Sequence, residues 1–266
     1  MFAPIHERTD RVDGWVSLEV SPLLAYDSQK SSDEAKALHA KANRRNLFIG
    51  TREGLPAIEE TIASGVPVNV TLLFSREQYE AAAEAYLRGL ERRLSAELSL
   101  DVHSVASLFV SRWDKTTMDK VPSNLRDKLG IAISQQAYKS YRDLLETDRW
   151  QRLAAHGARP QRLLFASTGT KDPQASDVLY IGALAAPNTV NTMPEETLLA
   201  FDAHGRVERT LPRDGGDGDE TVAAYGRAGI DVAALASQLQ KEGAKSFDDS
   251  WQDLLDAIGT KSQALA

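Results

Sequence analysis

The chain has 266 residues, 42% hydrophobic and 26% charged, which is an ordinary balance for a globular protein with an apolar core. Its formal net charge of −7 argues against nucleic acid as the main partner, because proteins that bind the phosphate backbone present a basic face. The absence of cysteine excludes disulfides, thiolate metal sites and a cysteine nucleophile, and it fits a reducing cytoplasm. No apolar run reaches the roughly 18 residues of a membrane span, and the acidic stretch Met1–Val20 does not look like a signal peptide.

Short apolar runs alternate with longer amphipathic stretches along the chain. The runs predicted to form strands are Val16–Val20, Asn46–Ile49, Val66–Phe74, Ser104–Val110, Arg162–Ser167 and Thr189–Asn191. The stretches predicted to form helices between them are Ser32–Lys41, Leu55–Ser64, Ser75–Leu94 and an interrupted one over Leu125–His156. Because apolar strands separated by helices are typical of a parallel sheet covered by helices, the sequence predicts an α/β fold.

Local signals indicate where some of these helices begin and end. Ser31 and Ser32 precede two acidic residues and are predicted to cap the first helix. Gly65 is predicted to end the second helix, since glycine commonly follows a helix C-terminus. Ser75, followed three residues later by Gln78, has the spacing of a capping box for the third.

The C-terminal part of the chain is predicted to be helical after a loop. The loop spans Asp202–Gly218, and the helices are Val222–Ala228, Asp231–Glu242 and Phe247–Ile258. Gly243 is expected to separate the last two helices, which we expect to pack on the outside or the bottom of the domain. We therefore predict one domain over residues 1–266, with C-terminal helices from about 219 to 260.

Alternating strands and helices fit either a barrel or an open doubly wound sheet, and two features favour the barrel. No G-x-G-x-x-G turn of the kind that binds dinucleotides follows any strand. Several strands also carry polar residues at their C-terminal ends, where the catalytic groups of an α/β barrel gather. The sequence therefore predicts a TIM-type barrel.

Three polar residues within apolar strands are candidates for catalysis. In VPVNVTLLFS, alternation places Asn69 and Thr71 on one side of a strand among valines and leucines. A buried amide and hydroxyl need partners, so a structural hydrogen-bonding role and a catalytic role both fit. Glu19, inside VSLEV, is a carboxylate whose burial would raise its pKa and suit it to acid–base work, although an ion pair is the alternative.

Two further segments carry candidate anion-binding residues. In SVASLFVSRWD, Arg112 follows an apolar strand, where a guanidinium suits phosphate recognition, and an ion pair with Asp114 is the alternative. In LLFASTGTKD, small hydroxyl residues, a glycine and Lys171 follow a strand and could form a phosphate-holding loop. This loop lacks the complete P-loop pattern, so we do not expect nucleotide binding.

The remaining chemistry-bearing residues do not form recognised constellations. The five histidines (His6, His39, His103, His156 and His204) are scattered and have no metal-ligand spacing. No G-x-S-x-G elbow supports serine–histidine–aspartate catalysis. We therefore expect neither a metal site nor serine–histidine–aspartate catalysis.

Six segments in order resemble the bacterial transaldolase family from about Val12 to the end of the chain. They read VSLEV, EGLPAIEE, VNVTLLFS, SVASLFVSRWD, RLLFASTGTKD and NTVNTMP. The resemblance implies a (β/α)8 barrel in the pentose phosphate pathway. Such an enzyme transfers a dihydroxyacetone unit from a ketose phosphate (sedoheptulose 7-phosphate or fructose 6-phosphate) to an aldose phosphate. It uses no cofactor; a lysine on the fourth barrel strand forms a Schiff base with the ketose.

The resemblance also implies roles for individual residues. Glu19 matches an acid that helps to activate a catalytic water, Asn69 an asparagine near the Schiff base, and Thr71 a threonine that positions the water. The residues matched to substrate and phosphate binding are Ser107 and Phe109 in the pocket, and Arg112, Ser167 and Lys171 at the phosphate.

Two departures from the family pattern bear on activity. The family's fourth strand reads N-L-F-I-K-I-P-G-T-x-E-G, whereas this chain reads NLFIGTREG, so the lysine and its two followers are absent between Ile49 and Gly50. The chain also begins near the third strand, so we expect an incomplete barrel with the equivalents of strands 3–8. We expect a second copy or a complementing subunit to cover its open edges.

Three hypotheses follow. The chain is an active transaldolase that uses another lysine, a non-catalytic remnant that binds sugar phosphate or a partner subunit, or an unstable fragment. Among the eleven lysines, only Lys171 lies next to a strand end in the sequence.

Overall fold

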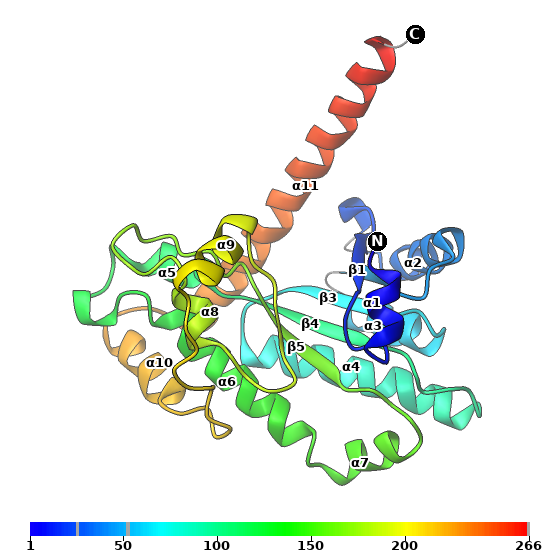
Figure 1. The fold of residues 1–266 in the computed structure, drawn as a ribbon, viewed down its shortest axis with the longest axis horizontal. Helices are drawn as coiled ribbons and strands as arrows, with labels where there is room; N and C mark the ends of the chain where they lie inside the picture. Colours follow the sequence, from blue (N-terminus) through cyan, green and yellow to red (C-terminus); the bar gives the residue numbers. More distant parts are fainter. Residues whose placement is uncertain (25–26, 52–53, 265–266) are drawn as a thin grey trace.

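The computed structural model describes residues 1–24, 27–51 and 54–264, and its centre is a six-stranded parallel sheet in sequential order. The strands are β1 (Val16–Glu19), β2 (Leu47–Thr51), β3 (Val68–Leu73), β4 (Ser104–Phe109), β5 (Gln161–Ala166) and β6 (Val190–Asn191). Figure 1 shows the sheet curling, with helices along its outer side. Six curled parallel strands form part of a (β/α) barrel, which confirms the predicted fold class.

Helices connect the successive strands on the outside of the sheet. The connecting helices are α2 (Ser28–Ala42), α3 (Leu55–Ala63), α4 (Arg76–Ser95), α5 (Ser111–Thr117), α6 (Leu129–Leu144), α7 (Asp148–Ala155) and α8 (Leu179–Ala183). The remaining elements are α1 (Ala3–Arg8), η1 (Pro22–Leu24), η2 (Ser123–Leu125), α9 (Glu195–His204), α10 (Gly218–Arg227) and α11 (Val232–Ala264). The interrupted helix predicted over residues 125–156 is thus two helices, α6 and α7.

The register of the sheet decides which side chains point into the half-barrel. Ile49 packs with Ala35 of α2, so it faces the helices. The next residue, Gly50, therefore faces inward, because successive residues of a strand point to opposite sides. Gly50 lies level with Glu19 on β1 and with Asn69 on β3, and residues level in a parallel sheet share a face. The inner face therefore carries three of the residues singled out by the sequence.

The caps of α2 and α4 show how local hydrogen bonds set helix ends. Asp27, not Ser31 or Ser32, caps α2, which corrects the sequence prediction. Ser31 is buried within the first turn and donates to the Leu24 carbonyl oxygen at 2.6 Å, so its hydroxyl anchors η1 instead. Ser75 caps α4 as predicted, accepting from the Gln78 amide at 3.2 Å.

The C-terminal region differs from the sequence prediction in two respects. The predicted loop over residues 202–218 begins with the last turn of α9, and the two helices predicted on either side of Gly243 are one helix, α11. A glycine inside a helix costs only about 1 kcal/mol, and Gly243 also lies where a Cβ would be 2.9 Å from the Leu72 side chain. The first half of α11 packs against β3, whereas Figure 1 shows its second half projecting from the molecule.

An aromatic cluster closes the N-terminal end of the half-barrel. Trp15 stacks on Phe48 with ring centroids 4.1 Å apart and meets His6 edge-on at 4.5 Å. The His103 ring lies 4.8 Å from the Trp15 ring, and burial lowers the pKa of His103 to about 4. Nearby Asp101 opposes this shift, while Arg159, Arg162 and His6 add to it.

The neutral His103 leads to a prediction about acid stability. Folding lowers the pKa of His103 from 6.5 to about 4, so the unfolded chain binds a proton more readily than the folded one. The folded state therefore becomes less stable as the pH falls through that interval. We expect His103→Gln to show a smaller loss of melting temperature than the unchanged chain between pH 6.5 and pH 4. Thermal melts at both pH values check this, and an equal loss in both proteins would contradict it.

Within the described ranges, no helix is long and apolar enough to cross a membrane.

Candidate functional site

A chain of polar side chains runs across the inner face from β1 to β4. The Asn69 amide nitrogen donates to the Ser17 hydroxyl at 3.2 Å, and the Ser107 hydroxyl donates to the Asn69 amide oxygen at 2.7 Å. Asn69 and Ser107 are buried, so these bonds hold the amide in one orientation. Asn69 therefore has the structural hydrogen-bonding role that the sequence allowed. The same bonds would also hold its amide in place for a ligand.

Gly50 occupies the inward-facing strand position directly after Ile49. A Cβ placed there would overlap the Glu19 carboxyl group, so that carboxyl group covers the Gly50 Cα. The space that a longer side chain would need at this position is thus filled by the neighbouring strand's acid. Arg52 and Glu53, which follow in the NLFIGTREG segment, lie outside the described residues.

Glu19 is less buried than its apolar strand suggested. β1 is the edge strand, its Val16 and Leu18 are 42% and 41% exposed, and Glu19 itself is half-buried. Glu19 is therefore only partly enclosed, and its acid–base role stays a prediction. The physical reason is that one side of β1 faces no further strand in the part of the chain that the structure describes.

The backbone is irregular where β3 reaches the C-terminal end of the sheet. The register against β4 shifts between Val70 and Leu73, and Leu72 has a positive φ of 62°. A left-handed conformation is costly for leucine and persists only where the surroundings enforce it. The bulge follows buried Thr71 directly and brings the Leu72 side chain against Gly243 of α11.

Arg112 lies in the first turn of α5, directly beyond β4. Its guanidinium carbon is 5.0 Å from the centre of the Phe109 ring, and Phe109 is buried on the inner side of β4. Burial lowers the pKa of Arg112, and the charge of Glu242 on α11 opposes that shift. A half-buried guanidinium stacked on an aromatic ring keeps its donors in a fixed plane, which suits bidentate recognition of an anion.

The alternative ion pair between Arg112 and Asp114 does not form. Asp114 is buried and accepts hydrogen bonds from the Leu129 amide at 2.9 Å, the Gly130 amide at 3.2 Å and the Tyr180 hydroxyl at 2.8 Å. Burial raises the pKa of Asp114 to about 6, although these three bonds oppose the shift. Asp114 therefore joins α5 to the start of α6 and to α8.

This anchoring role of Asp114 was not predicted from the sequence. The signal available was weak: one aspartate two residues after the arginine, and a Leu-Gly pair at a helix start 15 residues later. Only the fold brings these groups together.

Ser167 lies beside the residue that precedes Arg112. The Ser111 amide donates to the Ser167 carbonyl oxygen at 3.0 Å, and the two hydroxyls are 3.1 Å apart. Ser167 has a positive φ of 56°, so the chain turns sharply at the end of β5. The ends of β4 and β5 thus place Ser167 beside Ser111, one residue before Arg112. Lys171 is exposed farther along the loop and has no ion-pair partner in the described part of the chain.

No lysine lies on the inner face of the six described strands. All the lysines of the chain are outside the strands, and none is buried. They are Lys30, Lys36, Lys41, Lys115, Lys120, Lys128, Lys139, Lys171, Lys241, Lys245 and Lys261. Among residues 1–24, 27–51 and 54–264, no three histidine or acidic side chains gather as a metal site would require.

This chain is similar to known proteins over most of its length. The family model described as transaldolase/fructose-6-phosphate aldolase matches residues 1–258. A transaldolase of Parafrankia sp. is 45% identical over 97% of this chain and 73% of its own length. A transaldolase of Thermobifida fusca is 44% identical over 99% and 75%, and transaldolase 2 of Streptomyces coelicolor is 42% identical over 100% and 75%.

Proposed function

From the premise that this chain belongs to the transaldolase/fructose-6-phosphate aldolase family, we propose that it binds sugar phosphates at the C-terminal ends of β4 and β5 without forming the family's Schiff base. The observation that carries the proposal is Gly50. It takes the inward position after Ile49 where the family motif has lysine, and the Glu19 carboxyl group covers it.

The arrangement around Arg112 supports binding of the phosphate. The stacked guanidinium would form two parallel hydrogen bonds to phosphate oxygens, and the Ser167 hydroxyl lies on the adjacent strand end. Lys171 would add a point charge from the loop beyond. Asn69 and Ser107 would face the sugar, since both lie on the inner face below this end of the sheet.

Calorimetry with fructose 6-phosphate tests the binding directly. We expect saturable binding by the unchanged chain, and a roughly 10- to 100-fold weaker affinity for Arg112→Gln, because about 1.5–3 kcal/mol of charged hydrogen bonding is lost. Arg112→Lys keeps the charge but not the planar fork, and we expect an intermediate affinity.

Two controls separate this site from general anion binding. Arg206 lies on the loop after α9, beside Gly182 of α8, so Arg206→Gln should bind as the unchanged chain does. Fructose without phosphate should bind more weakly than its phosphate ester. Equal affinities of Arg112→Gln and the unchanged chain would contradict the proposed phosphate site.

The second candidate function is the transfer of a dihydroxyacetone unit between sugar phosphates. It is favoured by the ordered set of Asn69, Thr71 and Ser107 on the inner face. This function needs an amine supplied from outside the six strands. Turnover of fructose 6-phosphate with erythrose 4-phosphate by the purified chain would establish it and contradict our preferred proposal.

A further inference from the structure

β1 ends the sheet and exposes apolar side chains at its edge. Val16 and Leu18 point to the helix side of the sheet and are 42% and 41% exposed. The Val16 amide donates to the carbonyl oxygen of Asn46, just before β2, at 2.9 Å, and the Val20 amide donates to that of Gly50 in β2 at 3.2 Å. The N–H and C=O groups of successive strand residues point alternately to the two sides of the strand, so those of Ser17 point away from β2, to the open edge. An apolar edge of this kind is a template for pairing with another strand.

The spacing of these residues is self-complementary. When two copies of an edge strand meet across a two-fold axis that crosses the sheet, they run antiparallel and each residue pair occurs twice. An axis at Ser17 places the two Ser17 residues opposite each other as a hydrogen-bonded pair. It also places Val16 opposite Leu18 of the second copy, twice, on the side where both are exposed. The apolar pairs then cover each other, as cross-strand neighbours do in a sheet.

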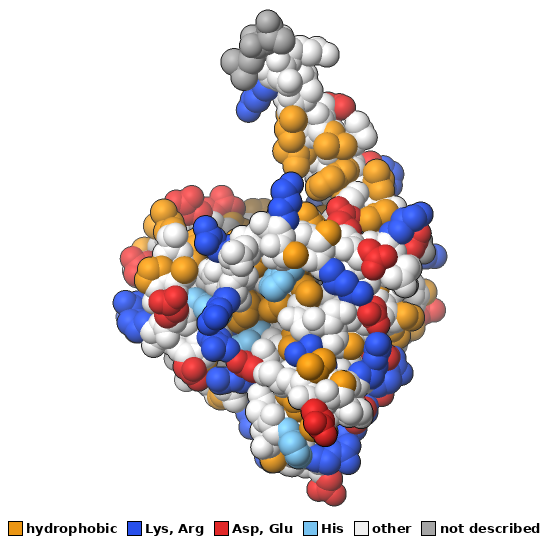
Figure 2. All heavy atoms as spheres, turned by 90° about the vertical axis from the view of Figure 1, so that its right-hand side faces the viewer, with side chains coloured by type: hydrophobic (Ala, Val, Ile, Leu, Met, Phe, Trp, Pro, Cys, Tyr) orange, Lys and Arg blue, Asp and Glu red, His pale blue; other side chains and the backbone are white. Residues whose placement is uncertain are grey.

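The second half of α11 presents an apolar stripe on the same side of the molecule. The stripe, defined as Trp251, Leu254, Leu255 and Ile258, follows helical spacing. Leu254, Leu255 and Ile258 are 50%, 43% and 56% exposed. α11 packs against η1, which directly follows β1. Figure 2 shows hydrophobic side chains along the projecting helix, above the face that carries α1, α2 and β1.

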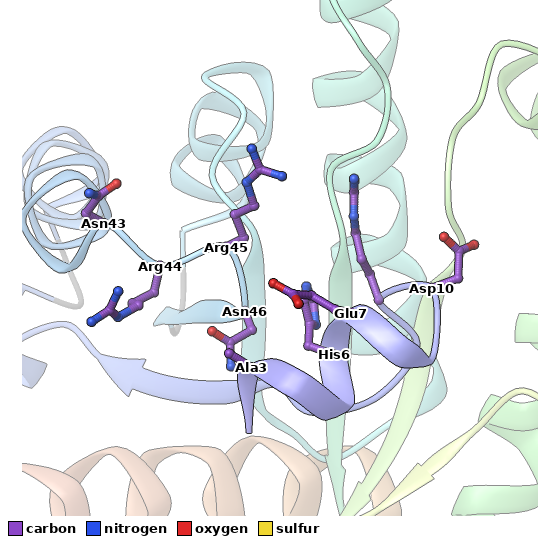
Figure 3. Close-up of a pocket in the computed structure, with 9 residues that line it drawn as sticks. Ala3, His6, Glu7, Asp10, Asn43, Arg44, Arg45 and Asn46 are labelled. Atoms are coloured by element: carbon purple, nitrogen blue, oxygen red, sulfur yellow. The ribbon is translucent and has the colours of Figure 1, made fainter. Parts of the chain in front are cut away.

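The charges of the two surfaces are complementary. Between Lys245 and Lys261, α11 carries four aspartates against two lysines. At the opposite end of β1, Arg44 and Arg45 line a hollow of about 510 Å³ between α1 and the start of β2, as Figure 3 shows. Neither guanidinium has an ion-pair partner among the residues that the structure describes, and Val12 nearby is 45% exposed.

Antiparallel pairing brings these surfaces together, because it places the η1 end of one β1 beside the Arg44 end of the other. We propose that β1 is the contact between two copies of this chain, paired antiparallel about Ser17, with the acidic half of each α11 packed beside Arg44 and Arg45 of the other copy. This contact joins the open sheets of the two copies and covers the stripe.

Light scattering on the full chain tests the contact. We expect a dimer whose dissociation constant rises at least tenfold in Leu18→Lys, since two lysines would then face apolar partners. The double variant Arg44→Glu, Arg45→Glu should also weaken the dimer, and more so at low salt. Leu198→Lys, at a 52% exposed leucine on α9, is the matched control and should dimerise as the unchanged chain does.

The register is tested by disulfide formation, which the cysteine-free chain makes specific. We expect a mixture of Val16→Cys and Leu18→Cys chains, distinguishable by mass, to form the mixed disulfide, because directly opposite residues have Cα atoms about 4.5–5.5 Å apart. Each variant alone should cross-link far less. A monomer at all concentrations, a dimer unaffected by Leu18→Lys, or no preference for the mixed disulfide would each overturn the proposal. So would a complex that forms only with a different polypeptide.

Discussion

Replacing Gly50 with lysine is expected to give this chain a covalent adduct with fructose 6-phosphate that borohydride traps and that the unchanged chain does not form. The new side chain would point into the half-barrel, level with Asn69. It would have to displace the Glu19 carboxyl group, which is the end of a flexible side chain. A primary amine at this position can condense with the ketose carbonyl, and borohydride reduces the resulting imine.

The pH dependence of this adduct follows from Glu19. A neighbouring carboxylate favours the charged form of the new lysine and raises its pKa, whereas only the neutral amine attacks the carbonyl. The yield of adduct should therefore rise with pH above neutrality. At pH 7, the double variant Gly50→Lys, Glu19→Gln should give a higher yield than Gly50→Lys alone.

Gly50→Met is the matched control, since it has similar length and no amine. Gly50→Met should form no adduct with fructose 6-phosphate. The change in its melting temperature measures the steric cost of the longer side chain without any effect of the amine. If Gly50→Lys binds fructose 6-phosphate by calorimetry but forms no adduct at any pH, the proposed assignment of this strand position is wrong.

The largest effect on stability is expected from Asp114→Ala. This change leaves the buried amides of Leu129 and Gly130 and the Tyr180 hydroxyl without their acceptor. We expect the free energy of unfolding, measured by urea denaturation, to fall by about 3–5 kcal/mol. Because α5 also carries Arg112, fructose 6-phosphate should bind more weakly as well.

Asp114→Asn keeps the shape and one acceptor oxygen, so we expect a loss of only about 1–3 kcal/mol at pH 7. The pH dependence identifies the carboxyl group itself. Folding raises the pKa of Asp114 from 3.8 to about 6. The protonated carboxyl group therefore stabilises the fold below pH 3.8, and this stabilisation is lost as the pH rises through 6. The advantage of the unchanged chain over Asp114→Asn should therefore be larger at pH 4 than at pH 7. An advantage that does not change with pH would contradict a titrating Asp114.

Asp114 and His103 act in opposite directions over the same pH range. Acid stabilises the fold through Asp114 and destabilises it through His103, so the two effects partly cancel in the unchanged chain. Removing His103 should therefore make the chain relatively more stable in acid, and removing Asp114 should make it relatively less stable in acid.

The fold could be predicted from the sequence because its strands are short apolar runs with clear boundaries. All six predicted strands are present, and their parallel order follows from the helices between them. The cap of α2 was not predictable from Ser31, because its hydroxyl bonds to Leu24 in a neighbouring element. The continuity of α11 through Gly243 likewise depends on a close contact with Leu72, which local propensity does not contain.

Part of the candidate site could be predicted for a similar reason. Alternation along β3 placed Asn69 and Thr71 on one face, and the structure confirms that both are buried there. The exposure of Glu19 depends on whether a strand lies beyond β1, which VSLEV does not indicate. The role of Asp114 depends on three groups that lie 15 to 66 residues away in the sequence.

Whether the unchanged chain forms a Schiff base is decided by its intact mass after borohydride treatment with fructose 6-phosphate, with Gly50→Lys treated in parallel. We predict that the mass of the unchanged chain stays the same while Gly50→Lys gains the mass of the reduced sugar phosphate. A reduced adduct on the unchanged chain, mapped to any of its lysines, would show that a competent amine exists outside the strands and would overturn the proposal that this chain binds sugar phosphates without a Schiff base.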